Sequence, residues 1–154
     1  MSIHRIRLAG PWACQKYEPS TIPDRAERQT CRLPFTLDER VELGGRPTAW
    51  ALFRHFHKPT GISDTTRVFV AMELQDAEIV LLLNGELLVH ELQPLQLPGT
   101  GAAMDRVSDG QRMSHREADI SSRLAASNEL QLQVAQSTPD RPAILRQVWL
   151  VIRE

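Results

Sequence analysis

Apolar and polar residues alternate along several short stretches of the chain, a pattern typical of β-strands that bury one face. In the clearest of these stretches, every second side chain is apolar and is expected to face the core: Val68, Val70, Met72 and Leu74. Residues 50–57 alternate in the same way, but neither of their faces is purely polar. About seven or eight such strands, separated by turn signals and without an internal repeat, predict an all-β chain folded as an antiparallel β-sandwich.

The most apolar stretch, residues 80–90, is divided in its middle by Asn84-Gly85. These two residues tolerate the positive φ angles of a type I′ turn at little steric cost, so the stretch is predicted to form a β-hairpin. Its apolar content is too high for two strands that each have one wet face. We therefore expect at least one arm to be buried on both faces or covered by a long loop.

Regular alternation is lost between about residues 91 and 117, where prolines and glycines interrupt the chain, and we expect a long loop there. A connection of this length in a compact domain is either functional or mobile, so a binding site would first be sought in it. Two polar residues beyond it have predicted local roles. Asp119 is expected to accept backbone N–H groups at the start of a short helical turn, and Asn128 to adopt a left-handed conformation before the next strand.

Length, charge and cysteine content narrow the class of protein. The 154 residues suffice for one domain with a sizeable core and are too few for two ordinary domains. The formal net charge is -1, so no overall field attracts nucleic acid or an anionic membrane. The first residues lack the apolar core of a signal peptide, and we expect a cytoplasmic protein. Cys14 and Cys31 are then expected to be reduced thiols, whereas an oxidising compartment would allow one bridge.

A series of short motifs follows in a set order along the chain: Leu8-Ala9-Gly10-Pro11-Trp12, Leu33-Pro34, Leu52-Phe53-Arg54-His55-Phe56, Leu83-Asn84-Gly85, Asp119-Ile120-Ser121 and Asn128-Glu129-Leu130. Each motif alone is weak, but in this order and spacing they resemble the sugar-binding N-terminal domain of glycoside hydrolase family two, the relatives of β-galactosidase and β-glucuronidase. The resemblance covers nearly the whole chain. It implies a galactose-binding-like jelly roll that spans residues 1–154 as a single domain.

Most of the matched residues are expected to hold the fold together and to bind nothing. Trp12 would pack in the core, and Arg54, if buried, needs a carboxylate or carbonyl partner. In the family, both catalytic glutamates lie on a separate barrel domain, and the sequence ends at Glu154. The resemblance therefore implies a protein that is not an enzyme, with no catalytic residue and no cofactor.

Two histidines are candidates for ligand contact. His55 and His57 lie two apart on a predicted strand, so both imidazoles point to one face. A metal site would need a third ligand, such as His90 or His115, that no spacing fixes, and we predict surface histidines and no metal.

Trp149 is the third candidate ligand-binding residue. The predicted last strand places it beside Leu145 and Val151, opposite the inward Ile144, so its face is expected to be apolar and partly exposed. An exposed apolar strip more often marks a protein interface than a sugar platform.

Two functions remain open. The first is a non-catalytic carbohydrate-binding or carbohydrate-associated module that uses His55, His57 and Trp149. The alternative is a structural or assembly protein that uses the Trp149 face to form a homo-oligomer or to dock a partner enzyme. Exposure of these side chains in a pocket favours the first function, and a flat self-complementary patch favours the second.

Overall fold

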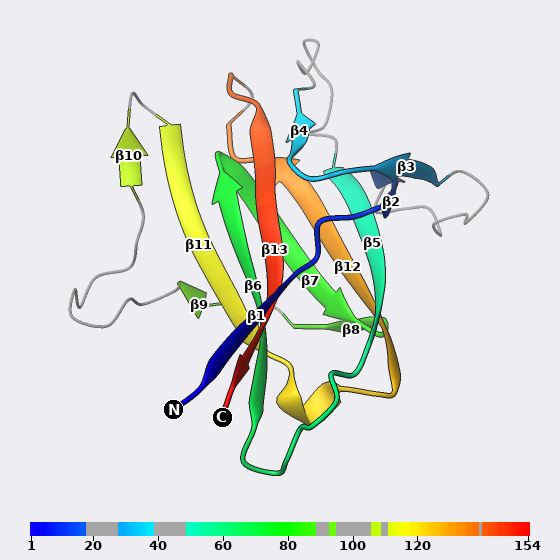
Figure 1. Cartoon of the computed structure of the whole chain (residues 1–154). Helices are drawn as coiled ribbons and strands as arrows, with labels where there is room; N and C mark the ends of the chain where they lie inside the picture. Colours follow the sequence, from blue (N-terminus) through cyan, green and yellow to red (C-terminus); the bar gives the residue numbers. More distant parts are fainter. Residues whose placement is uncertain (18–27, 39–48, 89–92, 95–105, 109–110, 139) are drawn as a thin grey trace.

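The computed structural model of the chain describes residues 1–17, 28–38, 49–88, 93–94, 106–108, 111–138 and 140–154. These residues form two antiparallel β-sheets that pack face to face, as Figure 1 shows. The prediction of an all-β antiparallel sandwich is confirmed. Within the described ranges, no helix has the length and apolar character needed to cross a membrane.

The first sheet has seven strands, and we call it the seven-stranded sheet. Its main path runs in the order β1 (Ile3–Arg7), β13 (Ala143–Arg153), β6 (Arg67–Gln75), β11 (Gln111–Asp119) and β10 (Arg106–Ser108). Two short strands join it off this path: β4 (Phe35–Leu37) pairs with β13, and β9 (Gln93–Pro94) pairs with β11.

The second sheet, the six-stranded sheet, lies behind the first in Figure 1. Its strands follow the order β3 (Gln29–Cys31), β2 (Trp12–Tyr17), β5 (Ala49–His57), β12 (Ser127–Gln136), β7 (Ala77–Leu83) and β8 (Glu86–Leu87). The 3-10 turn η2 (Ser121–Arg123) connects β11 to β12 across one end of the sandwich.

The core lies between the two sheets. The four side chains predicted to face it from β6 are all buried, and β12 contributes three more from the other sheet: Leu130, Leu132 and Val134. Trp12 is also fully buried, as expected, and its indole Nε1 donates to the carbonyl of Leu8 at 2.8 Å. Arg54 meets the requirement for a carbonyl partner, because its Nη1 donates to Pro11 O at 2.6 Å.

The hairpin prediction is confirmed at its turn. Asn84 has φ 52 and Gly85 has φ 81, the pair of positive angles that a type I′ turn requires. The second arm is shorter than the apolar pattern suggests, since β8 contains only Glu86–Leu87.

The predicted long loop at about residues 91–117 contains the short strands β9 and β10 and is wrong in its last part. Residues 111–119 form β11, which pairs with β6 along most of its length. Its buried positions include Ser114 and Ala118, which are too small and too weakly apolar to produce a visible hydrophobic alternation. Residues 91–92, 95–105 and 109–110 lie outside the described residues.

The predicted left-handed conformation of Asn128 is also wrong. Among the described residues other than glycine, only Asp76 and Asn84 have a positive φ. Asn128 lies inside β12, and its buried side chain shapes the preceding turn instead. Its Oδ1 accepts from Ala125 N at 2.9 Å and its Nδ2 donates to Ala125 O at 2.8 Å.

Candidate functional site

The two candidate histidines lie on the outer face of the six-stranded sheet. Alternation along β5 turns Leu52 and Phe56 into the core and leaves His55 and His57 exposed. The neighbouring strand β12 places Glu129 opposite His55 and Ser127 opposite His57. The two-residue spacing therefore brings both imidazoles to one face, next to the start of β12.

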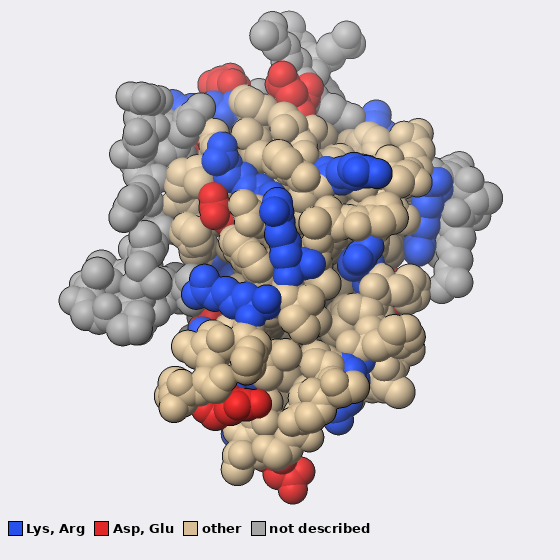
Figure 2. Space-filling model, in the orientation of Figure 1, with Lys and Arg blue, Asp and Glu red and all other residues tan. Residues whose placement is uncertain are grey.

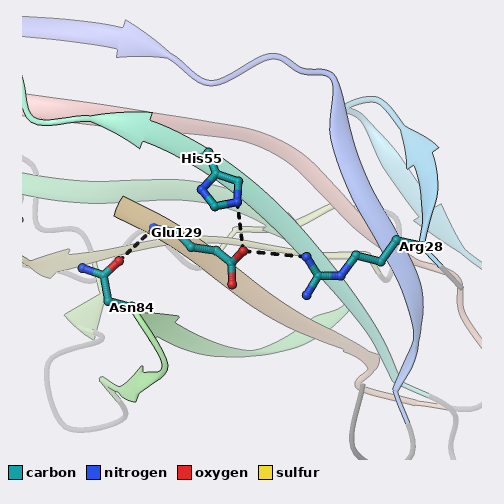
Figure 3. Close-up of polar contacts among 4 residues, drawn as sticks. All are labelled: Arg28, His55, Asn84 and Glu129. Atoms are coloured by element: carbon teal, nitrogen blue, oxygen red, sulfur yellow. Dashed lines mark hydrogen bonds and ion pairs between the residues drawn. The ribbon is translucent and has the colours of Figure 1, made fainter. Parts of the chain in front are cut away.

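A polar cluster forms around the carboxylate of Glu129 (Figure 3). Its Oε2 lies 3.0 Å from His55 Nε2 and 3.7 Å from Arg28 Nη1. The side chain of His55 is 68% exposed, whereas those of Glu129 and Arg28 are 23% and 16% exposed. The guanidinium of Arg28 lies 3.5 Å above the ring of Phe53, a cation–π contact that fixes it on the sheet.

The hairpin tip holds the backbone of Glu129 in place. Asn84 Oδ1 accepts from Glu129 N at 2.8 Å, and Asn84 N donates to Glu129 O at 2.9 Å (Figure 3). Asn84 Nδ2 also donates to Asn128 Oδ1 at 3.1 Å. Two of the motifs that carry the family resemblance thus bind each other, which is a structural role for both.

This cluster offers hydrogen-bonding groups. The carboxylate of Glu129 is an acceptor that lies between the imidazole of His55 and the guanidinium of Arg28. His55 adds an exposed imidazole that donates or accepts according to its tautomer. Phe53 is covered by Arg28 and is buried, so it offers no stacking platform to a ligand.

Trp149 lies on the other sheet. It is half-buried on the outer face of β13, where Arg7 of β1 is its direct neighbour in the register. Figure 2 shows Lys and Arg side chains spread over the side of the molecule that β1 and β13 occupy in Figure 1, with fewer Asp and Glu side chains among them. The face of Trp149 is therefore partly exposed, as predicted, but cationic where an apolar face was expected.

A β-bulge also reverses two of the side-chain orientations expected along β13. The pairing of β13 with β6 shifts register between Leu145 and Gln147, so that Leu145 turns into the core and Ile144 away from it. A strict two-residue period predicts the reverse, with Ile144 in the core and Leu145 on the outer face.

The structure does not bring the three candidate residues together. His55 and His57 point outward from one sheet and Trp149 outward from the other, with the core between them. Because stacked sheets lie about 10 Å apart, a ligand the size of a monosaccharide cannot touch both outer faces.

The metal site that a third histidine would complete gains no support from the described residues. His115 lies on β11 in the other sheet, and His90 is outside the described residues. No group of three potential metal ligands occurs within the described ranges.

Glu117 and Asp119 are two carboxylates on β11 that both have partners. Glu117 pairs with Arg153 at 2.7 Å. Asp119 Oδ1 accepts from Ser121 N at 2.9 Å, which confirms its predicted role at the helical turn.

The two cysteines lie on the neighbouring strands β2 and β3 as free thiols. Burial, assisted by a hydrogen bond and charge interaction with Cys14, raises the pKa of the Cys31 thiol to about 12 from its ordinary 9.0. Since the folded state favours the neutral thiol, its contribution to stability is complete below pH 9.0 and is lost as the pH rises toward 12.

The raised pKa predicts slow alkylation of the folded protein. At about pH 8 the thiolate fraction of Cys31 is roughly a thousandth of that in the unfolded chain, and the thiolate is the reacting species. We expect iodoacetamide to modify Cys31 at least about tenfold more slowly in buffer than in urea, measured by mass spectrometry of the peptide. Equal rates in the two conditions would contradict this description of the thiol pair.

Sequence reasoning found the histidines but missed their partners. Glu129 alternates with Gln131 and Gln133 along its strand, and this polar face was a usable signal that the two glutamines and Glu129 share a surface. No comparable signal identifies Arg28, which lies directly before β3 and is far from Glu129 in the sequence.

Comparison with known proteins bears on the fold. No family model matches the sequence, and no curated protein matches it. The chain is similar in structure to an FMN-binding β-glucuronidase from Facaelibacterium prausnitzii L2-6, with a TM-score of 0.59 and 20% identity over 97% of this chain and 22% of that one. It is also similar to a calcium binding mutant of β-glucuronidase 2 from Bacteroides uniformis, with a TM-score of 0.63 and 15% identity over 98% of this chain and 18% of that one.

A third similar structure is a β-D-mannosidase from Dictyoglomus thermophilum, with a TM-score of 0.52 and 11% identity over 89% of this chain and 16% of that one. The chain thus shares its fold with a segment of glycosidases, the enzymes to which its motifs pointed, and that resemblance is confirmed in fold. The chain spans about a fifth of the length of these structures or less.

Proposed function

We propose that this chain is a non-catalytic carbohydrate-binding module. The observation that carries the proposal is the shared fold: nearly the whole chain superimposes on a segment of two β-glucuronidases, proteins named for their action on glucuronides. Glu117 and Asp119, two carboxylates on β11, already have partners in Arg153 and Ser121.

The outer face of the six-stranded sheet is the proposed contact surface. His55 and Glu129 lie side by side across β5 and β12, and Gln131 and Gln133 continue the same row of polar groups. Sugar hydroxyls both donate and accept, and a row with a carboxylate, an imidazole and two amides satisfies both kinds of bond. Without an aromatic platform, the affinity is expected to be weak, with Kd of about 1 mM.

Matched histidine variants test this surface. We expect His55→Ala and Glu129→Gln to weaken binding of a simple methyl glycoside at least about fivefold, by loss of one or two polar contacts of about 0.5–1.5 kcal/mol each. The control is His115→Ala, which removes an imidazole from the opposite sheet and should leave affinity unchanged. Saturation-transfer NMR with a panel of glycosides measures the affinity of each variant and of the unchanged chain. Equal affinity of the His55 and His115 variants would refute the assignment.

A second candidate function is assembly through the outer face of the seven-stranded sheet. The half-buried Trp149 lies there with the exposed Ile3, and Arg5 and Arg7 border them. Aromatic and arginine side chains are enriched in protein interfaces. If this face joins two copies, light scattering will give the mass of a dimer, and Trp149→Glu will return it to the mass of one chain.

A further inference from the structure

One end of the sandwich contains a hollow that is separate from the histidine face. The connection between β5 and β6 lies beside η2 there, as Figure 1 shows. Together they enclose an open hollow of about 260 Å³. This is near the lower limit of small-molecule sites, which begin at about 300 Å³, and it suits one monosaccharide ring.

Internal hydrogen bonds fix both walls of the hollow. In the β5–β6 connection, Thr66 Oγ1 accepts from Ser63 N at 3.1 Å and lies 3.0 Å from Ser63 Oγ. On the other side, Ser121 Oγ accepts from Val68 N at 2.8 Å and thereby attaches η2 to the start of β6. These side chains have their partners already, so they form a preorganised frame.

Four other lining side chains are exposed and make no hydrogen bond or ion pair with any other described residue: Lys58, Asp64, Arg67 and Ser122. Ile62 and Leu124, which also line the hollow, are half-buried and pack against the core. The hollow thus combines an apolar floor with a rim of two cations, one carboxylate and one hydroxyl.

We propose that this hollow binds a hexuronic acid residue, a pyranose ring that carries a carboxylate. The ring's C–H face would lie on Ile62 and Leu124, and its carboxylate would pair with Lys58 and Arg67. Asp64 and Ser122 would bond its hydroxyls. The inference rests on the proposed function only in taking the ligand to be a sugar.

The charges of the rim select this class of ligand. Two cations and one carboxylate leave a net charge of one positive unit, which a single ligand carboxylate neutralises. A neutral hexose leaves both cations unpaired. A compact oxyanion such as sulfate gains nothing from the apolar floor.

Amide chemical-shift mapping on the 15N-labelled chain tests the proposal, with methyl β-D-glucuronide as the probe. The expected result is saturable shifts in residues 62–67 and 121–124, with an affinity at least tenfold higher than for methyl β-D-glucoside. Sodium acetate and sodium sulfate serve as anions without a ring and should leave these residues unshifted. Lys58→Gln combined with Arg67→Gln should lower the glucuronide affinity at least tenfold. The matched control, Arg5→Gln with Arg7→Gln on the seven-stranded sheet, should not change it.

The same spectra separate the two proposals. Glycoside shifts at His55 and Glu129 with none in the hollow would overturn the uronate site and leave the proposed function standing. Acetate binding as tightly as the glucuronide in the hollow would also overturn it, since that is a plain anion site. Glucuronide shifts confined to the hollow would support the uronate site and remove the histidine face from the proposed function.

Discussion

Replacing Trp12 with alanine should lower the free energy of unfolding by about 3–5 kcal/mol, the range for truncating a large buried aromatic residue. Trp12 is one of the largest fully buried side chains in the core, and the truncation leaves a cavity between the sheets. It also leaves the carbonyl of Leu8 without the indole donor 2.8 Å away. Urea denaturation followed by circular dichroism measures the change, which would be among the largest for any single residue of this chain.

Two further variants separate packing from hydrogen bonding at this position. Trp12→Phe keeps much of the apolar volume and loses the Nε1 bond, so its cost should be smaller than that of the alanine variant. Trp149→Ala removes the same side chain from a half-buried site on an outer face and should cost less than half as much. If Trp12→Ala and Trp149→Ala destabilise the chain equally, then Trp12 does not occupy the core position described here.

The second large effect is expected from Asn128→Ala, at about 2–4 kcal/mol, because a buried side chain is truncated and two backbone groups of the turn lose their partner. The side chain of Asn128 is 1% exposed and bonds to Ala125 N and Ala125 O. Asn84→Ala should cost less, about 1–2 kcal/mol. Asn84 lies on the exposed hairpin tip, where water replaces part of the lost hydrogen bonding, and alanine tolerates the positive φ there less well than asparagine.

A double-mutant cycle isolates the contact between the two asparagines. The 3.1 Å bond from Asn84 Nδ2 to Asn128 Oδ1 predicts a coupling energy of about 0.5–1.5 kcal/mol in urea denaturation. Strict additivity of the two alanine variants would mean that this side-chain bond contributes nothing to stability. The two motifs would then be joined only by the bonds between Asn84 and Glu129.

The strands that the sequence predicts correctly are those whose buried positions carry large apolar side chains. The alternation in β6 and the Asn84-Gly85 turn were recognisable because branched apolar residues and a positive-φ dipeptide leave a local signal. β11 left none, since its buried positions carry Ser114 and Ala118. The orientation of Leu145 was missed because a bulge depends on pairing with another strand, which no local pattern records.

The candidate site was predictable only in part. The spacing of His55 and His57 fixed their common face, since alternation along a strand is a local property. The partnership with Arg28 and the hollow lined by Lys58 and Ser122 both join segments far apart in the chain. Only tertiary packing brings such segments together, so no motif or spacing predicts the Arg28 contact or the hollow.

The central claim is that the chain binds sugar as a single copy and does so on the face that carries His55. The most direct test is a titration of the 15N-labelled chain with simple methyl glycosides, at a concentration where light scattering gives its mass. The predicted result is the mass of one chain, with saturable shifts on β5 and β12 and none on β1 or β13. A stable dimer whose spectrum responds to no glycoside would contradict the claim and identify the sandwich as an assembly unit.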